Sequence, residues 1–234
     1  MRTALAASLV TTLVIAASAA LAADITPGKA DDPIAGVPSS WRVDPSGTPL
    51  TDAELKKLAG GDVLSALIEV PDNPVKKGVA IGVVNAAPAK VLATCADFEH
   101  FPDFMPYVAK IVVDKRDGRT AQVSYWLEFP LGIGNRNYQL DLVNDHKDVD
   151  GKKVYTSEWK YTGKGNIKDT SGSWDIAPYG DGTKSLVRYT VFTDPGGSIP
   201  NWAKNMAAGT AMTKVVKRVQ ERVLSKDAAA PVDY

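Results

Sequence analysis

The sequence of 234 residues predicts an α+β domain in which a curved antiparallel sheet of about seven strands wraps around one long C-terminal helix. Segments between residues 107 and 193 alternate apolar and polar residues with a period of two, which is typical of half-buried strands. Asp-Gly pairs at 117–118, 150–151 and 181–182 separate several of these segments, as hairpin turns require. Residues 200–225 then change to the helical spacing of apolar residues.

The strand pattern assigns one face of the sheet to the core. An apolar strand is expected at 79–85, followed by strands at 107–114, 119–129, 136–146, 152–161, 167–178 and 184–193. Because side chains alternate between faces, one face collects large apolar residues: Val123, Tyr125, Leu127, Tyr138, Leu140, Leu142, Tyr155, Trp159, Trp174, Ile176, Val187, Tyr189 and Val191. The other face is polar, with Trp126 as an exception. This pattern predicts a sheet that is covered on one side.

Helical segments are expected to cover the apolar face. Pro88 suits the first turn of a short helix that runs to about Cys95, and residues 97–101 predict a further helical turn that ends before Pro102. In the final helix, one stripe holds apolar or small residues: Trp202, Gly209, Met212, Val216, Val219 and Val223. The opposite side carries four basic residues: Lys214, Lys217, Arg218 and Arg222. The apolar stripe should therefore lie on the sheet.

The first 23 residues predict a signal peptide. Arg2 supplies a positive charge, residues 4–21 are almost entirely apolar or small, and Ala20-Leu21-Ala22 matches the A-x-A pattern of a cleavage site. An uncleaved membrane anchor is the alternative, because the apolar run is just long enough to span a bilayer. We expect cleavage near Ala22 or Ala23 and a mature protein that is periplasmic or secreted.

The rest of the chain divides into four segments. They are a flexible leader (24–48), a short N-terminal helical extension (49–78), the domain itself (79–225) and a tail (226–234). The leader is rich in Pro, Gly, Asp and Ser, and its Trp41 is a candidate to dock on the domain. Within the extension, Thr51 and Glu54 predict a helical capping box and Gly60 a helix stop.

Charge and the rare residue types argue against several classes of function. The 27 Lys and Arg residues equal the 27 Asp and Glu residues, so there is no electrostatic reason to expect a nucleic-acid partner. Cys95 is the only cysteine, and its apolar surroundings predict a buried small hydrophobic side chain. His100 and His146 lack the spacing of metal ligands, and no nucleophile elbow, P-loop or dinucleotide motif is present. The sequence predicts no catalytic residue, no metal and no cofactor.

Two stretches resemble a known superfamily. Residues 194–206, which begin Asp-Pro-Gly-Gly-Ser-Ile-Pro-Asn-Trp, resemble the entry into the final helix of START domains. Residues 97–108, with Phe98, Phe101 and Pro102, resemble the segment after the first strand in the wider Bet v 1-like (SRPBCC, polyketide cyclase/dehydrase) superfamily. The resemblance covers about residues 79–225 and implies the helix-grip fold. Members bind sterols, phospholipids, quinones or other apolar molecules between sheet and helix.

Small residues in the final helix suggest where a ligand would lie. Residues 207–211 read Ala-Ala-Gly-Thr-Ala and should face the aromatic side of the sheet. The aromatic rings could fill this space by close packing, or the space could be a cavity. The resemblance favours a cavity, and the candidate ligand contacts are apolar residues and aromatic residues with hydrogen-bonding tips: Tyr125, Leu127, Tyr138, Leu140, Tyr155, Trp159, Trp174, Tyr189, Trp202, Met206, Gly209 and Met212.

These patterns predict an exported protein that binds or transfers a hydrophobic small molecule or lipid, rather than an enzyme. Two alternatives stay open: a polyketide cyclase or aromatase-like enzyme that uses cavity tyrosines, and an interaction domain that binds no ligand. We expect a monomer whose partner is a lipid, sterol, quinone or similar ligand. Transient membrane contact is a further candidate interaction, through the basic side of the final helix or the apolar segment 129–135, which could instead gate the cavity or pack under the N-terminal helix.

Overall fold

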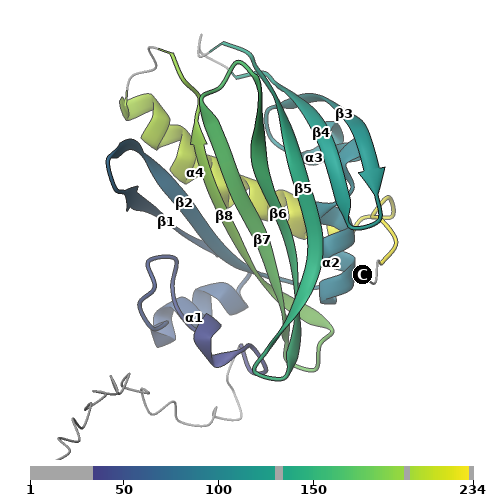
Figure 1. The fold of residues 1–234 in the computed structure, drawn as a ribbon. Coiled ribbons are helices and arrows are strands. Elements are labelled where there is room, and N and C mark those ends of the chain that lie inside the picture. Colours follow the sequence, from purple (N-terminus) through teal and green to yellow (C-terminus); the bar gives the residue numbers. More distant parts are fainter. Residues whose placement is uncertain (1–33, 130–133, 198–200, 232–234) are drawn as a thin grey trace, which may run out of the picture.

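An eight-stranded antiparallel sheet forms the centre of the protein, in the order β1-β2-β8-β7-β6-β5-β4-β3 (Figure 1). The computed structural model describes residues 34–129, 134–197 and 201–231, with side chains in the last range from residue 211 onward. The predicted signal peptide lies outside these ranges. The strands are β1 (Val63–Val70), β2 (Asn73–Val84), β3 (Val108–Asp117), β4 (Thr120–Leu127), β5 (Arg136–Val149), β6 (Lys152–Gly165), β7 (Asp169–Tyr179) and β8 (Lys184–Asp194).

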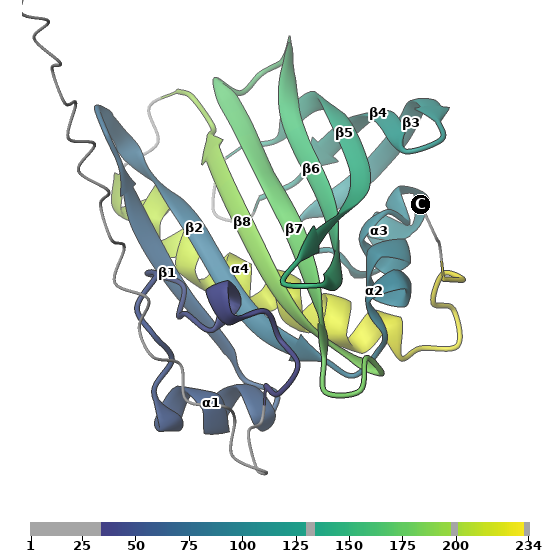
Figure 2. The same cartoon turned by 60° about the horizontal axis from the view of Figure 1, so that its bottom comes forward.

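The helices cover the inner face of the sheet. The long helix α4 (Asn201–Val223) lies along β1 and β2 and also contacts α2 and α3 (Figures 1 and 2). The connection between β2 and β3 contains α2 (Pro88–Cys95), the short 3-10 helix η2 (Phe98–His100) and α3 (Phe101–Phe104). This arrangement confirms the predicted α+β helix-grip fold. No helix in the described ranges is long and apolar enough to cross a membrane.

Local sequence explains several of the element boundaries. Helix α1 (Asp52–Ala59) begins at a capping box, because the Thr51 hydroxyl accepts from the Glu54 backbone N–H and the Glu54 carboxylate accepts from the Thr51 backbone N–H. Pro88 occupies the first turn of α2, as predicted. The turn between β5 and β6 needs positive φ at Asp150 (53°) and Gly151 (70°), which an Asp-Gly pair tolerates.

Strand β1 was not expected from the sequence. Residues 63–70 were assigned to an N-terminal helical extension, but after α1 they form the edge strand of the sheet and pair with β2. The sheet therefore has eight strands instead of about seven. The apolar residues of 63–70 do not alternate cleanly with polar ones, and most are only half-buried at the edge, so the period-two signal is weak.

The expected flexible leader is packed in its described part. Ile34, Val37 and Trp41 are buried on the outer face of the sheet, where Leu58 of α1 and residues of β2, β6, β7 and β8 complete a second apolar cluster. The backbone N–H of Gly180 donates to the carbonyl of Ala35. The prediction that Trp41 docks on the domain is confirmed, and residues 34–41 pack against the sheet, which the composition of the leader did not indicate. Buried apolar side chains outweigh the polar composition of this segment.

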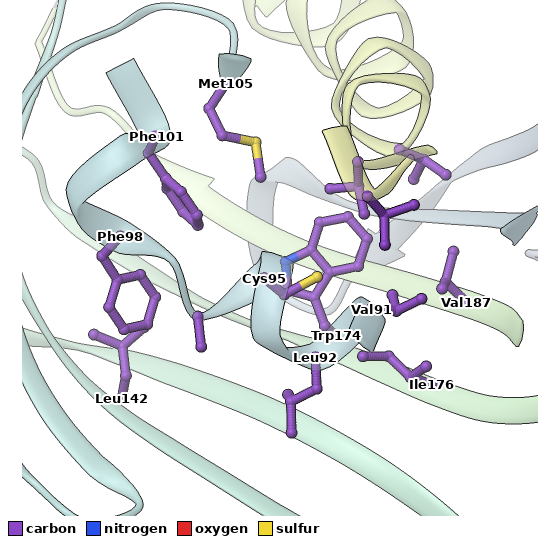
Figure 3. Close-up of a cluster of buried hydrophobic side chains, with 14 of the residues drawn as sticks. Val91, Leu92, Cys95, Phe98, Phe101, Met105, Leu142, Trp174, Ile176 and Val187 are labelled. Atoms are coloured by element: carbon purple, nitrogen blue, oxygen red, sulfur yellow. The ribbon is translucent and has the colours of Figure 1, made fainter. Parts of the chain in front are cut away.

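The main core lies between the sheet and the helices. Figure 3 shows part of it, with Val91, Leu92 and Cys95 of α2 opposite residues of the sheet that include Trp174 and Ile176. On the other side of the core, α4 approaches β2 closely at two glycines. A Cβ atom at Gly78 would overlap the sulfur of Met212, and one at Gly82 would lie 3.0 Å from Val216 Cγ1. Because Gly78 and Gly82 have no side chain, α4 can approach the backbone of β2 closely.

An ion cluster joins the end of α4 to the segment after α2. Asp97 has one carboxylate oxygen 2.6 Å from His100 Nδ1 and the other 3.7 Å from the Arg222 guanidinium. The hydrogen bond with Asp97 is the largest cause that raises the pKa of His100 above its ordinary value of 6.5. Protonated His100 therefore favours the folded state through Asp97.

We predict that Gly82→Val lowers the free energy of unfolding by about 1–3 kcal/mol, because the new side chain would overlap Val216 and Val63. Urea denaturation of both proteins measures the difference. Gly60→Ala is the matched control, since Gly60 has a φ of −76° and a Cβ there would meet only ordinary contacts. Equal stability of Gly82→Val and the unaltered protein would show that α4 does not pack closely on β2.

The His100–Asp97 pair predicts a pH-dependent contribution to stability. Because the pKa of His100 is higher in the folded protein, the contribution is complete below about 6.5, the unfolded value, and is lost as pH rises through the folded pKa. Urea denaturation at several pH values should show that the stability difference between the unaltered protein and His100→Gln shrinks as pH rises. A difference that stays constant with pH would contradict the prediction.

Candidate ligand-binding cavity

A cavity of about 290 Å³ lies between the inner face of the sheet, α4 and the segment around α3. Strands β4 to β8 supply most of its aromatic wall, and β2 contributes Val75 and Gly78. Helix α4 contributes Ala211, Met212 and Val215 from the opposite side. The volume is close to the lower limit for sites that hold drug-sized ligands.

The structure brings eight of the predicted ligand contacts to this cavity. They are Tyr125, Leu127, Tyr138, Leu140, Trp159, Trp174, Tyr189 and Met212. The side chains of Trp202, Met206 and Gly209 lie outside the described part of the chain. Ala211 is the one small residue of 207–211 whose side chain the structure describes, and it lines the cavity. Of the candidate gate at 129–135, Phe129 lines the cavity, and residues 130–133 lie outside the described ranges. That these residues contact a ligand stays a prediction.

Tyr155 is the predicted contact that the structure places elsewhere. Its side chain is on the inner face, as expected, but packs in the core that α2 covers. Its ring centroid lies 6.2 Å from that of His146, and the Lys153 ammonium lies 4.8 Å from the Tyr155 ring. The alternation of residues along a strand determines the face of a side chain but not its distance from the cavity, so the sequence could not separate Tyr155 from Trp159.

The aromatic side chains of the wall pack against one another. The rings of Tyr125 and Tyr138, on neighbouring strands, are stacked with centroids 5.5 Å apart and an interplanar angle of 9°. The Tyr189 ring lies 4.5 Å from that of Trp174 and 5.9 Å from that of Trp159. Such contacts hold bulky side chains in fixed positions, which lets a cavity persist beside them.

The sequence interpretation missed the part of the wall that the β2–β3 connection supplies. Cys95 is buried as predicted, but it also faces the cavity, as do Phe101, Met105 and Val108. Ser157 of β6 lies on the same face as Trp159 and lines the cavity as well. The apolar residues after Pro102 were a usable signal for this wall, because such residues in a connection need cover.

Apart from Lys76, the polar side chains of the described wall are thiol, hydroxyl and indole groups without a formal charge. Burial raises the pKa of the Cys95 thiol and of the phenols of Tyr125, Tyr138 and Tyr189 above their ordinary values. Lys76 is the one basic residue that lines the cavity within the described ranges, and its ammonium pairs with the Glu69 carboxylate at 2.5 Å. No cluster of three or more potential metal ligands occurs in the described part of the chain. The site is suited to bind an apolar molecule that carries few polar atoms.

Comparison with known proteins agrees with this geometry. The family described as polyketide cyclase/dehydrase and lipid transport matches residues 80–227. The chain belongs to this family. It therefore has a START-type (SRPBCC) domain, and the match covers the sheet from β2 onward together with α4.

Individual relatives of the START-type domain include lipid transfer proteins. The phosphatidylcholine transfer protein of Mus musculus is 26% identical over 179 residues, which cover 72% of this chain and 83% of the relative. The STAR-related lipid transfer protein of Xanthomonas axonopodis has a similar structure, with a TM-score of 0.62 and 22% identity over 70% of this chain and 94% of that chain. The Zhui aromatase/cyclase of Streptomyces sp. R1128 has a TM-score of 0.51 and 13% identity over 66% of this chain and 98% of that chain. The two structural comparisons show the shared fold.

Proposed function

We propose that this protein is an exported carrier that binds a hydrophobic small molecule or lipid between the sheet and α4 and transfers it. The cavity carries the proposal. Its wall combines aromatic and aliphatic side chains, and Lys76, its one fully charged member in the described part of the chain, is already paired. Burying an apolar ligand in such a site gains the hydrophobic free energy of both surfaces.

The relatives support binding and transfer. Phosphatidylcholine transfer proteins share sequence with this chain, and the STAR-related lipid transfer protein shares its fold. At one side of the cavity, the ring of Tyr107 lies 5.3 Å from that of Phe129, and the Lys214 ammonium lies 5.5 Å from the Tyr107 ring. The exposed Tyr107 ring beside a cation suits the interface of a membrane with anionic lipids, from which a carrier would take its ligand.

Export is part of the proposal and is supported by the N-terminal sequence alone. Expression of the full chain in a bacterium with a periplasm, followed by cell fractionation and intact-mass measurement, tests it. We expect a mature protein in the periplasm or medium that begins after Ala22 or Ala23. A full-length chain retained in the membrane fraction would instead support the uncleaved anchor.

A cyclase function has less support in the chemistry of the cavity. Tyr125, Tyr138 and Tyr189 are present to donate hydrogen bonds, and one structural neighbour is an aromatase/cyclase. A cyclase also needs a base, and the described wall contains no histidine and no carboxylate. The raised pKa of the three phenols keeps them protonated, so no phenolate is available to act as a base at neutral pH. We therefore favour binding over catalysis.

We predict that Ala211→Phe lowers the amount of co-purified or added hydrophobic ligand by about ten-fold or more, because the new ring would occupy the cavity. Organic extraction, lipid mass spectrometry and transfer between vesicles measure the effect. Lys57→Phe is the matched control, since it adds the same ring at an exposed position of α1, which does not line the cavity. Equal ligand binding by Ala211→Phe and the control would place the ligand elsewhere. Absence of any ligand from the unaltered protein, with no binding from a lipid panel, would refute the carrier function.

A further inference from the structure

Three phenol groups lie close together in the cavity wall. Tyr125 and Tyr138 stack on neighbouring strands, and Tyr189 of β8 lines the same cavity. Burial is the largest cause of the raised pKa of Tyr125 and of Tyr189; the phenols of Tyr138 and Tyr189 add to it at Tyr125, and the Tyr138 phenol and the Cys95 thiol add to it at Tyr189. Groups that influence one another in this way are electrostatic neighbours. The three phenols therefore belong to the wall of one cavity, and two of them are stacked on each other.

Within the described part of the chain, none of these three hydroxyls has a protein hydrogen-bond partner. Tyr125 is only 7% exposed. Tyr161 of β6 differs from them, because its hydroxyl donates to the carbonyl oxygen of Ile167 at 3.4 Å. A hydroxyl on a cavity wall loses its water when an apolar ligand fills the cavity, and a donor that then has no acceptor is unfavourable. An acceptor atom on a ligand would satisfy these donors.

The charge of the wall limits what that ligand can be. Lys76 is engaged with Glu69, and the rest of the described wall holds no full charge to neutralise a phosphate or a carboxylate. Burial of an unpaired ion in an apolar site is strongly unfavourable. The volume of about 290 Å³ also suits one chain or a compact ring system better than a lipid with two long chains.

We propose that Tyr125, Tyr138 and Tyr189 form a hydrogen-bonding pole that selects an uncharged, compact lipid by donating to its carbonyl, ester or hydroxyl oxygen. This inference rests on the proposed carrier function and narrows its ligand class. It also separates this protein from its relatives that are named for phosphatidylcholine, since that lipid carries a phosphate and a quaternary ammonium group.

Four probes that differ in their polar group test the proposal. They are a long-chain methyl ketone, the alkane of the same length, the fatty-acid anion of the same length and a phosphatidylcholine. Quenching of tryptophan fluorescence measures each affinity, because Trp159 and Trp174 line the cavity, and native mass spectrometry identifies the bound species. We expect the ketone to bind about five-fold or more tightly than the alkane, and more tightly than either charged probe.

Removal of the hydroxyls should abolish this preference. In the triple variant Tyr125→Phe, Tyr138→Phe and Tyr189→Phe, the ketone and the alkane should bind within about two-fold of each other, while the alkane affinity stays unchanged. Each single variant should lower the preference in part, which keeps the test valid if the triple variant does not fold. Tyr161→Phe is the matched control, because its hydroxyl already has a partner and does not line the cavity.

The outcomes separate this inference from the carrier function. If the fatty-acid anion or phosphatidylcholine binds more tightly than the ketone, the site does not select an uncharged ligand, but the carrier function is still supported. If all of the phenylalanine variants keep the preference for the ketone over the alkane, the three hydroxyls do not select the ligand, and the carrier function is again still supported. If none of the four probes binds the unaltered protein, the carrier function itself fails, and the inference fails with it.

Discussion

The architecture depends on the fact that one helix is too narrow to cover the inner face of the whole sheet. Eight strands at a spacing of about 4.8 Å span roughly 34 Å, whereas an α-helix with its side chains is about 10–12 Å wide. Helix α4 therefore covers the sheet mainly along β1 and β2. The connection with α2, η2 and α3 covers a second part. Between these covers, aromatic residues of the sheet enclose a cavity.

The depth at which α4 packs links stability to the cavity. Gly78 and Gly82 let the helix approach β2, and Gly78 also lines the cavity beside Met212. The outer face of the same strand is held by Ile34, Trp41 and Leu58, which cover Ile81 and Val83. Strand β2 is thus buried on both faces, and α4 packs against a strand that is held in place from the other side. Any change in the distance between α4 and β2 would also change the width of the ligand site.

The chemistry of the wall is that of a binding site that holds its ligand by burial. Stacked and tilted rings keep the aromatic side chains in place, and burial keeps the phenols and the Cys95 thiol protonated. Hydrogen-bond donors are present, but the described wall has no base and no unpaired charge. A site of this kind can select a ligand by its length and by one neutral polar group.

The sequence by itself determined the faces of the sheet and several element boundaries. Alternation placed Tyr125, Tyr138, Trp159 and Tyr189 on one face because side chains must alternate, and Thr51 and Pro88 marked two helix starts through local bonding. Strand β1 and the packing of Ile34 and Trp41 were missed, because both depend on apolar partners that are distant in the sequence.

Only the tertiary structure decided which inward residues reach the cavity. Tyr155 and Trp159 carry the same sequence signal, yet α2 covers the first and leaves the second on the cavity wall. Cys95 and Phe101 reach the wall from a connection whose path the sequence does not reveal. The neutrality of the site and the grouping of its phenols likewise arise from strands that meet only in the folded sheet. Periodicity acts within one element, whereas a cavity is a property of several elements packed together.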